Sequence, residues 1–492
     1  MMKRTKIVAT IGPATASKEK IRQLIEAGMN VARINFSHGD HTSNGLIISH
    51  IKQIRQEMGV PVGIMADLQG PRIRTVVGAD VEIEKGKRVI VVDGLNSDQI
   101  INPRFLVAKQ ISESELKKCQ VIGLDWKGIT ADIEMGNEIL IEDGLMKVIV
   151  VEKYKDYLVA RVKDGGIVKN HKGVNIPDAK LNVGVVTEKD ECDLKFALQQ
   201  DVDFIALSFV SNAEEILEVK EKIKKILGSS AHPPLIVSKI ERKEAIKNIL
   251  EIIRATDIIM VARGDLGIEM EESRVVIYQK EITARCLRSA TPVIVATQML
   301  NSMIENPRPT RAEVSDVSNA VIDHTDSVML SGETANGKYP IESVKIMKEI
   351  IMNTEKSPFD FLVHGFLKDE ESSVSAAIAH SAHELSKDTH AVAIVAASVS
   401  GFTARMITRH RPNNSVFVIT NNIKTHHQLS LVWGVESFVL PECKDLDELI
   451  DRSVEALEKN KKVKSKDKLI MVAGRPGIAK EHMSLIKVEE VK

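Results

Sequence analysis

The chain has 492 residues, with 67 Lys and Arg against 68 Asp and Glu, a net charge of −1. That balance gives no electrostatic attraction to nucleic acid or to an anionic membrane, and 11 Phe, 4 Tyr and 2 Trp are too few for a protein that stacks single-stranded bases. A hydrophobic content of 43% is typical of a folded globular chain. Because of the charge balance and the small number of aromatic residues, we expect no nucleic-acid and no membrane partner.

The four cysteines are far apart in the sequence. Cys119, Cys192, Cys286 and Cys443 form neither a zinc-binding motif nor a disulfide framework, which is typical of a reducing compartment. The N-terminal residues lead directly into a strand-like segment without the apolar core of a signal peptide, and no apolar run reaches 18 residues. We therefore expect a cytoplasmic location.

Short, β-branched apolar runs recur along the chain and end in polar residues. Eight of them have the pattern of buried parallel strands: Lys6–Thr10, Val31–Asn35, Val62–Asp67, Phe204–Ser208, Leu235–Lys239, Ile258–Ala262, Val293–Thr297 and Val328–Leu330. Helical stripes lie between them, over 21–25, 216–227 and 246–253, and Gly28 and Gly228 follow the first two as C-caps. Eight alternating units predict a (β/α)₈ TIM barrel, with an open doubly wound sheet as the alternative.

Two further regions interrupt or follow this rhythm. Between Asp67 and Phe204, alternating strands and Asp-Gly turns indicate an inserted β-barrel lid domain. The acidic stretch Lys368–Glu371 resembles a linker, and strands and helices alternate beyond it, as in an α/β domain. The expected boundaries are 1–70 and 172–354 for the barrel, 71–171 for the lid, and 355–492 for the C-terminal α/β domain.

The active site of a TIM barrel lies at the C-terminal ends of its strands. Lys239 and Glu241 end one strand on the same side, and Asp265 follows the next strand. Two carboxylates meeting there would suit an octahedral Mg²⁺ site. The alternative is that they are ordinary salt-bridge partners of Lys239 and Arg263.

Cationic side chains gather at the same predicted rim. Arg33, Arg74 and Lys239 suit phosphate or carboxylate oxygens, and Gly264 precedes an expected helix start. This combination favours phosphoryl transfer, which depends on positioning and charge neutralisation. The segment Gly332–Lys338 matches G-x₄-G-K, but Tyr339 follows it in place of Ser or Thr, so we reject a P-loop.

An ordered set of motifs resembles the pyruvate kinase family. The motifs span the whole predicted barrel: KIVATIGP (6–13), ARINFSHG (32–39), ADLQGPRIRT (66–75), SKIE (238–241), IMVARGDLGIE (259–269), ATQMLNSM (296–303), PRPTRAE (307–313) and MLSGETA (329–335). The resemblance implies a glycolytic phosphotransferase that converts phosphoenolpyruvate and ADP to pyruvate and ATP. The alternatives are a non-catalytic relative and a barrel aldolase acting on Mg²⁺-bound enolpyruvate.

The resemblance also implies roles for residues of the substrate site. Glu241 and Asp265 would hold Mg²⁺ or Mn²⁺, Arg33 and Lys239 would contact the transferring phosphoryl group, and Lys239 would also neutralise the enolate. Gly264, Asp265 and Thr297 would hold the carboxylate end of the substrate. Thr297 would in addition lie on the route that protonates enolpyruvate.

Two more sets of residues follow from the resemblance. Arg74 and Lys172 match nucleotide contacts, and the family's K⁺ site matches Asn35, Ser37, Asp67 and the carbonyl of Leu68. K⁺-requiring members carry Glu at position 72, where this chain has Arg72. We expect Arg72 to replace K⁺; the alternative is that it points to solvent or pairs with a lid carboxylate while K⁺ still binds.

The remaining expectations concern regulation and assembly. The loop 398–403 resembles the family's binding loop for a phosphorylated effector, although Phe402 occupies a position that is often polar or basic. The tail after Gly477 lacks a Gly-x-Thr-Asn motif, which puts allosteric control in question. His324 and Ser211 replace a common Gly and Arg with effects that the sequence does not predict, and a homotetramer is the family's expectation.

Overall fold

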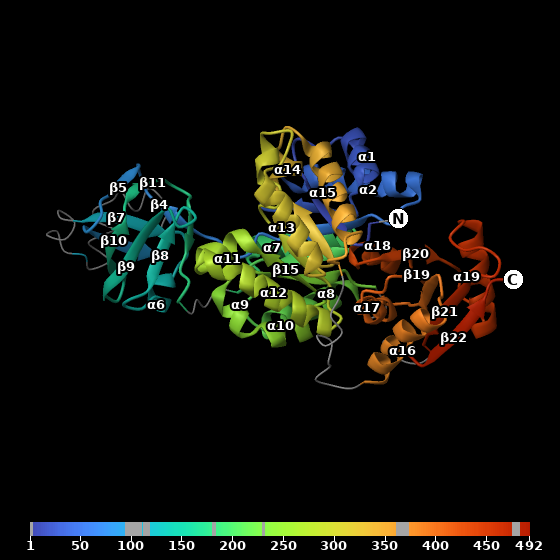
Figure 1. Cartoon of the computed structure of the whole chain (residues 1–492). Coiled ribbons are helices and arrows are strands. Elements are labelled where there is room, and N and C mark those ends of the chain that lie inside the picture. The colour runs from blue at the N-terminus through green and yellow to red at the C-terminus, as the bar shows by residue number, and fades with distance from the viewer. Residues whose placement is uncertain are drawn as a thin grey trace.

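The computed structural model describes residues 3–93, 111, 119–179, 184–228, 232–360, 373–474 and 483–492. Three bodies follow one another in Figure 1: a small β-barrel, a central (β/α)₈ barrel and a C-terminal α/β domain. The predicted linker Lys368–Glu371 lies outside the described residues, as does the tail motif that begins at Arg475.

Eight parallel strands close the central barrel in the order β1-β17-β16-β15-β14-β13-β3-β2. Their bounds are β1 Lys6–Ile11, β2 Val31–Asn35, β3 Gly63–Asp67, β13 Phe204–Leu207, β14 Leu235–Ile240, β15 Ile258–Ala262, β16 Val293–Ala296 and β17 Ser327–Leu330. Because β1 pairs with both β2 and β17, the sheet is closed, and the predicted TIM barrel is confirmed over an open sheet. Each predicted strand agrees with the observed one to within about a residue at either end.

Helices surround the barrel and bury one face against the strands. They are α1 Lys18–Ala27, α2 His41–Met58, α7 Glu188–Gln199, α8 Ala213–Leu227, α9 Lys243–Lys247, α10 Ile249–Ala255, α11 Arg263–Glu269, α12 Glu272–Arg288, α13 Arg311–Ile322, α14 Gly332–Ala335 and α15 Pro340–Glu355, with a 3₁₀ turn η1 at Asn301–Ile304. The predicted helix over 246–253 is wrong in one respect, since it divides at Asn248, whose amide Nδ2 donates to the carbonyl of Ser211 at 2.9 Å. Among the described residues, no helix has the length and apolarity to cross a membrane.

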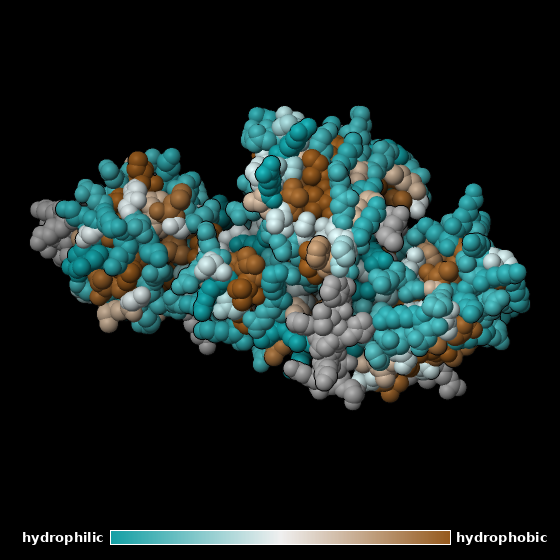
Figure 2. Space-filling model, in the orientation of Figure 1, coloured by the Kyte–Doolittle hydropathy of each residue, from teal (hydrophilic) through white to brown (hydrophobic). Residues whose placement is uncertain are grey.

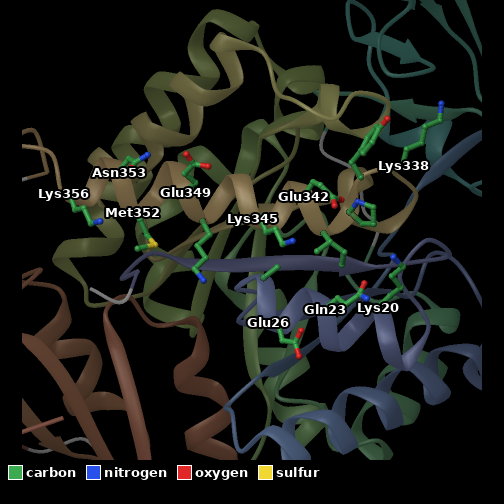
Figure 3. Close-up of a pocket in the computed structure, with 15 residues that line it drawn as sticks. Lys20, Gln23, Glu26, Lys338, Glu342, Lys345, Glu349, Met352, Asn353 and Lys356 are labelled. Atoms are coloured by element: carbon green, nitrogen blue, oxygen red, sulfur yellow. The ribbon is translucent and has the colours of Figure 1, made fainter. Parts of the chain in front are cut away.

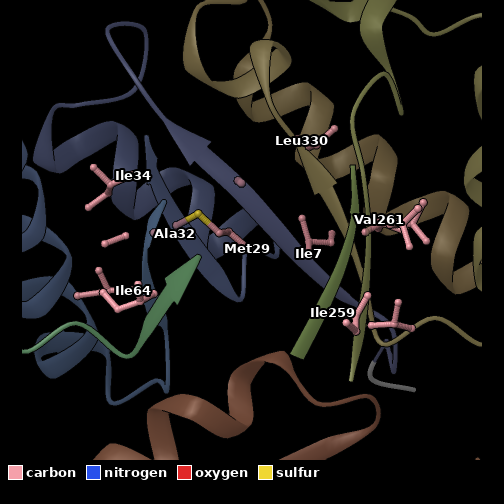
Figure 4. Close-up of a cluster of buried hydrophobic side chains, with 14 of the residues drawn as sticks. Ile7, Met29, Ala32, Ile34, Ile64, Ile259, Val261 and Leu330 are labelled. Carbon is pink, nitrogen blue, oxygen red and sulfur yellow. The ribbon is translucent and has the colours of Figure 1, made fainter. Parts of the chain in front are cut away.

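Successive side chains of each barrel strand pack into two different cores. Ile7 and Ile34 face the helices in the layer shown in Figure 4, whereas Val8 and Met65 fill the barrel interior. Leu431 from the C-terminal domain completes the interior cluster. Apolar side chains therefore fill the barrel interior, and we expect the active site at the rim of the barrel.

The lid is a second closed barrel, of seven strands, inserted between β3 and α7. Its strands run in the order β10-β6-β7-β4-β12-β8-β9, with β5 and β11 paired beside them. The bounds are β4 Ile73–Val76, β5 Val81–Ile83, β6 Arg88–Asp93, β7 Gln120–Leu124, β8 Glu138–Ile141, β9 Met146–Lys153, β10 Tyr157–Asp164, β11 Gly166–Val168 and β12 Gly173–Asn175, with one short helix, α6 Ile129–Asp132. The lid has its own apolar core and starts at the C-terminal end of β3, where the active site is expected.

The C-terminal domain is a five-stranded sheet in the order β20-β19-β18-β21-β22, with only β22 antiparallel. The strands are β18 Ala393–Ala397, β19 Ser415–Thr420, β20 Val435–Val439, β21 Lys468–Ala473 and β22 Leu485–Glu490. Its helices are α16 Val374–Asp388, α17 Phe402–Thr408, α18 Ile423–Gln428 and α19 Leu446–Lys459, with a 3₁₀ turn η3 at Leu429–Leu431.

This domain covers the N-terminal ends of the barrel strands, opposite the lid (Figure 1). Arg411 pairs with Asp326, which precedes β17, and the hydroxyl of Ser327 donates to the carbonyl of Leu431 at 3.0 Å. The face in Figure 2 is mostly hydrophilic, with small apolar groups between charged side chains. The lid and the C-terminal domain thus occupy opposite ends, and a cleft opens at the lid end.

Candidate active site

Four buried side chains from neighbouring strand ends form one charged network. Arg33 Nε donates to Asp67 Oδ2 at 2.6 Å, and Arg33 Nη1 donates to the hydroxyl of Thr10 at 2.9 Å. Lys239 Nζ lies 2.8 Å from Glu241 Oε1 and 3.5 Å from Asp67 Oδ1. The parallel register brings these residues together because β2, β3, β13 and β14 are consecutive in the barrel.

Burial and charge act in opposite directions on this network. Burial alone would raise the pKa of Asp67, but Lys239 and Arg33 outweigh it and hold that pKa below its ordinary value. Burial would likewise lower the pKa of Lys239, but Asp67 and Glu241 raise it. The site therefore presents a charged ammonium and a charged guanidinium in a largely water-free rim.

The carboxylates of Glu241 and Asp265 are close enough to influence each other electrostatically. Burial raises the pKa of Glu241, Lys239 lowers it, and the negative charge of Asp265 raises it again, so the two carboxylates interact. Glu241 Oε2 already accepts from the backbone N–H of Phe209 at 2.7 Å, which fixes its orientation. Within the described ranges no third His, Cys, Asp or Glu joins a metal-ligating group, as suits Mg²⁺, which usually keeps water ligands.

Thr297 adopts a strained conformation directly after β16. Its φ of 71° is in the left-handed region, which a β-branched residue rarely occupies. The strained turn brings its hydroxyl to the backbone N–H of Gly264, which donates to it at 2.7 Å. Arg263 stabilises this turn, because it donates to the Thr297 carbonyl at 2.8 Å and pairs with Asp316 at 2.7 Å. The sequence-predicted Gly264 and Thr297 are thus in direct contact.

The structure also brings together the residues expected at a monovalent-cation site. Asn35 Oδ1 accepts from the backbone N–H of Ser37 at 3.1 Å, and the carbonyl of Leu68 accepts from Ser208 at 2.8 Å. Asp67 Oδ1 is buried and makes no hydrogen bond within the described residues, although the ammonium of Lys239 lies 3.5 Å away. The charge of this oxygen is therefore met by an ion pair.

Arg72 faces the lid and not this oxygen cluster. Its guanidinium Nη2 lies 3.6 Å from Asp143 Oδ1, and a Cβ built on Gly173 would lie 3.2 Å from that same nitrogen. This is the second of the two placements that the sequence left open. The ion pair is exposed and contributes little to stability.

Lys172 lies at the start of β12 and forms an ion pair with Glu142 from the β8–β9 turn. Arg74 lies on the adjacent strand β4, where its backbone N–H donates to Asp125 at 2.7 Å. Between lid and barrel is a cleft of about 770 Å³, whose walls include Arg72 and Asp143 from the lid side and Asp265 from the barrel. The cleft is open enough for a nucleotide and a small carboxylic acid.

A second hollow, of about 900 Å³, lies on the flank of the barrel between α1 and α15 (Figure 3). Lys20, Glu26, Lys345 and Glu349 line it, with cations and carboxylates mixed along the groove. None of the sequence-predicted site residues lines this hollow. The lid cleft is therefore the candidate active site in spite of its slightly smaller volume.

Sequence reasoning missed three contributors to the network: Thr10, Ser208 and the backbone N–H of Phe209. Ser208 donates to Leu68 and accepts from Lys239 at 2.8 Å, so it links two of the predicted residue sets. Its position at the end of the fourth apolar run was the signal that could have identified it. Thr10 likewise ends the first apolar run, whereas Phe209 acts through its backbone and carries no comparable signal.

Three other sequence features have structural explanations. Glu333 is buried in the rejected P-loop segment and accepts from the backbone of Leu300 and Ser331, so this loop is folded around a carboxylate. His324 has a φ of 60°, the conformation in which a glycine is unstrained. Ser211 lies in the loop before α8, where Arg242 Nη1 donates to its hydroxyl at 3.3 Å.

A TIM barrel with a lid over its C-terminal rim, a cationic pair and two converging carboxylates defines a phosphoryl-transfer enzyme. Comparison with known proteins identifies the family. The model of the pyruvate kinase barrel domain matches residues 2–344, and that of the pyruvate kinase alpha/beta domain matches 376–489. The chain belongs to the pyruvate kinase family.

Relatives support this assignment over the full chain. A pyruvate kinase of Geobacillus stearothermophilus is 40% identical over 500 residues, covering 100% of this chain and 81% of the relative. Pyruvate kinase 2 of a Synechocystis strain is 38% identical, covering 100% and 80%. The solved structure of a pyruvate kinase from Cryptosporidium parvum has a TM-score of 0.88 at 32% identity, covering 100% of this chain and 96% of that one.

The activity follows from the family. The chain transfers the phosphoryl group of phosphoenolpyruvate to ADP, giving pyruvate and ATP, and the family implies a divalent metal requirement. This assignment excludes the barrel-aldolase alternative. The residues whose loss would mark a non-catalytic relative are all present: Arg33, Lys239, Glu241, Asp265 and Thr297.

Proposed function

We propose that Lys239 and Arg33 are the cations that stabilise the transferring phosphoryl group. The observation that carries this proposal is the placement of Lys239 Nζ, buried and held by Ser208, Glu241 and Asp67 at the open end of the barrel. Charge spreads over the phosphoryl oxygens in the transition state, and fixed cations in a poorly hydrated site stabilise it most. Asp67 orients both cations and so reduces the reorganisation needed during transfer.

Glu241 and Asp265 would hold Mg²⁺, or Mn²⁺ in its place. The bound ion would supply Lewis-acid polarisation of the substrate oxygens. The protein's own contribution is to hold two carboxylates in mutual repulsion, which a divalent cation relieves. Gly264 and Thr297 would then receive the carboxylate end of the substrate, and the Thr297 hydroxyl would lie on the route of the proton delivered to enolpyruvate.

A binding experiment tests the metal site without using turnover. Glu241→Gln and Asp265→Asn should each weaken Mn²⁺ binding, followed by electron paramagnetic resonance, by at least tenfold. Glu269→Gln is the matched control, because Glu269 is also a buried carboxylate of α11 but is hydrogen-bonded to Asn175 at 3.1 Å. Unchanged Mn²⁺ affinity in the first two variants would refute the assignment.

For the nucleotide, the lid supplies Arg74, which lies on β4, and Lys172, which directly precedes the paired strand β12. Both would contact ADP phosphates, because cations at the cleft suit a polyanionic ligand. Lys172→Met and Arg74→Met should raise KM for ADP and leave KM for phosphoenolpyruvate within about twofold.

A monovalent cation would be held by Asn35, Ser37, Asp67 and the Leu68 carbonyl. Asp67 Oδ1, which makes no hydrogen bond but lies 3.5 Å from Lys239 Nζ, and the engagement of Arg72 with the lid support retention of this site. We expect activity in tetramethylammonium buffer to fall at least tenfold below that in K⁺, and Arg72→Glu to show the same K⁺ dependence. Activity within threefold of the K⁺ value would instead show that Arg72 replaces the ion.

The last proposals concern the domain boundaries, the location, the assembly and the regulation of the protein. The proposed domain boundaries are 1–70, 71–171, 172–354 and 355–492, with the lid continuing through its strand β12 to Asn175, and the proposed location is cytoplasmic. Exposed Val276 and Ile277 on α12 favour burial in a homotetramer, which sedimentation would detect. A phosphorylated effector would meet the loop 398–403, which turns into α17 at Gly401 with a φ of 80°. Titration of the holoenzyme with sugar phosphates tests it.

A further inference from the structure

The turn between β8 and β9 places two carboxylates beside two cations of the lid. Glu142 pairs with Lys172, and Asp143 lies 3.6 Å from Arg72. Both acidic residues have left-handed backbone conformations, with φ of 52° and 55°. The Asp143-Gly144 pair is typical of a tight hairpin turn, and this turn presents both acidic side chains to cations of the lid.

The position of this acidic turn is defined by one backbone hydrogen bond and by its closeness to the barrel helix α11. The backbone N–H of Glu142 donates to the carbonyl of Gly173 at 2.9 Å, which holds the turn beside Lys172. On its other side, a Cβ built on Gly144 would lie 4.0 Å from Cγ2 of Ile268, a residue of the barrel helix α11. That helix also carries Asp265, so the turn lies at the mouth of the cleft, where lid and barrel meet.

We propose that Glu142 competes within the chain with the ADP phosphates for Lys172. This inference rests on the proposed role of Lys172 in nucleotide binding and goes beyond it. An ADP phosphate must displace the Glu142 carboxylate before it reaches the ammonium, and a displaced carboxylate then repels the bound nucleotide. Because the pair is about one-third exposed, it is weak enough for a polyanion to break.

The consequence is a lid whose nucleotide affinity is set below its maximum. With the nucleotide absent, the acidic turn neutralises the cation that would otherwise attract any phosphate. Phosphoenolpyruvate binds on the barrel side, to Lys239 and the metal carboxylates, and does not compete with Glu142. The competition therefore acts on ADP and spares phosphoenolpyruvate.

The central experiment is Glu142→Gln in the full-length enzyme loaded with Mg²⁺. We expect KM for ADP to fall about three- to fivefold and KM for phosphoenolpyruvate to stay within twofold. Calorimetric titration of ADP without phosphoenolpyruvate should show the same gain in affinity. The control is Glu134→Gln, which removes the same charge from the lid at an ion pair with Lys153 (2.7 Å), and should leave both KM values unchanged.

A second pair of variants separates this inference from the role of Lys172. Lys172→Met should raise KM for ADP, and Glu142→Gln added to it should have no further effect, since the competition needs both partners. An unchanged KM for ADP in Lys172→Met would refute the nucleotide role of Lys172. If Lys172→Met behaves as expected, three results overturn the competition alone: Glu142→Gln leaves KM for ADP unchanged, raises it, or lowers it equally in the Lys172→Met background.

Discussion

The two ends of the barrel both bury carboxylates, but they satisfy them differently. At the end covered by the C-terminal domain, Asp326 accepts from Arg411, from the backbone of Trp433 and from the backbone of Val293, at 3.0 to 3.1 Å. At the lid end, Asp67 accepts from Arg33 at 2.6 Å, while its Oδ1 makes no hydrogen bond and lies 3.5 Å from the ammonium of Lys239. The Asp326 carboxylate holds two domains together, whereas the Asp67 carboxylate pairs with two cations at the open rim.

The aromatic contacts show the same contrast. Trp433 lies between the guanidinium groups of Arg411 and Arg4, at 4.9 and 5.3 Å from its ring, and closes the covered end. The lid end carries the left-handed Thr297 (φ 71°), but left-handed residues also occur at the covered end, at His324 (φ 60°) and Arg411 (φ 47°). The two ends therefore differ in what surrounds their buried charges and not in the presence of backbone strain.

The largest effect should come from breaking the covered end. Arg411→Met leaves Asp326 buried beside Cys286 and without its cation, which should lower the free energy of unfolding by about 3–5 kcal/mol. Urea unfolding measures this. Arg4→Met is the control, because Arg4 stacks on the same Trp433 but donates only to an exposed carbonyl of Asn413, and its loss should cost under about 1 kcal/mol. Equal losses in the two variants would contradict the contrast.

At the open end, Lys239→Met should affect catalysis far more than stability. Removing the ammonium should lower kcat at least about 10²-fold, equivalent to about 3 kcal/mol of transition-state stabilisation. The melting temperature and circular dichroism spectrum should remain close to those of the wild type. Near-normal turnover in a correctly folded variant would refute the catalytic role of Lys239.

The smallest predicted effect is a pH dependence of the covered end. Burial, with Arg55, Lys424 and Lys52 nearby, lowers the pKa of His427 to about 3, and Asp203 faces its ring at 3.7 Å. Since an unfolded histidine has a pKa near 6.5, the unfolded chain binds more protons below that pH, and stability is lost as pH falls from 6.5 towards 3. Between pH 7 and 5 the loss from this group is at most about 2 kcal/mol.

The variant His427→Gln isolates this contribution. Its unfolding free energy should change less between pH 7 and pH 5 than that of the wild type, and the carboxylates common to both proteins cancel in the comparison. Identical pH profiles would show that His427 does not titrate differently in the folded and unfolded states.

How far the sequence predicts this molecule depends on which force shapes each part. The barrel strands were located because continuous apolar runs are needed to bury both faces of a parallel sheet. The strand Leu485–Glu490 was missed because it is an edge strand with several exposed polar side chains, and Val435–Val439 because it alternates too briefly. Helix 246–253 was predicted unbroken because a hydrophobic stripe carries no information about the bond from Asn248 to Ser211.

The site divides in the same way. Strand ends of a barrel converge by topology alone, so the grouping of Lys239, Glu241 and Asp67 followed once the strands were known. The partners of Arg72 and Lys172 lie on a lid turn about 70 residues from the first and 30 from the second. No local pattern records which carboxylate a loop will present, and only the folded lid shows that Asp143 and Glu142 take these positions.

The insertion point of the lid has a consequence for how the chain folds. The backbone N–H of Ile64 donates to Asp203, 139 positions further along the chain. The contact between Thr325 and Val293, which lies where β16 meets β17, spans 32 positions. Closing the longer loop costs only about 1.3 kcal/mol more, because loop entropy grows with the logarithm of length. The seam between β3 and β13 is thus one of two long-range closures of the barrel, the other being the pairing of β1 with β17, where Thr10 contacts Leu330 across 320 positions. The lid between β3 and β13 has its own core and can fold before its seam forms.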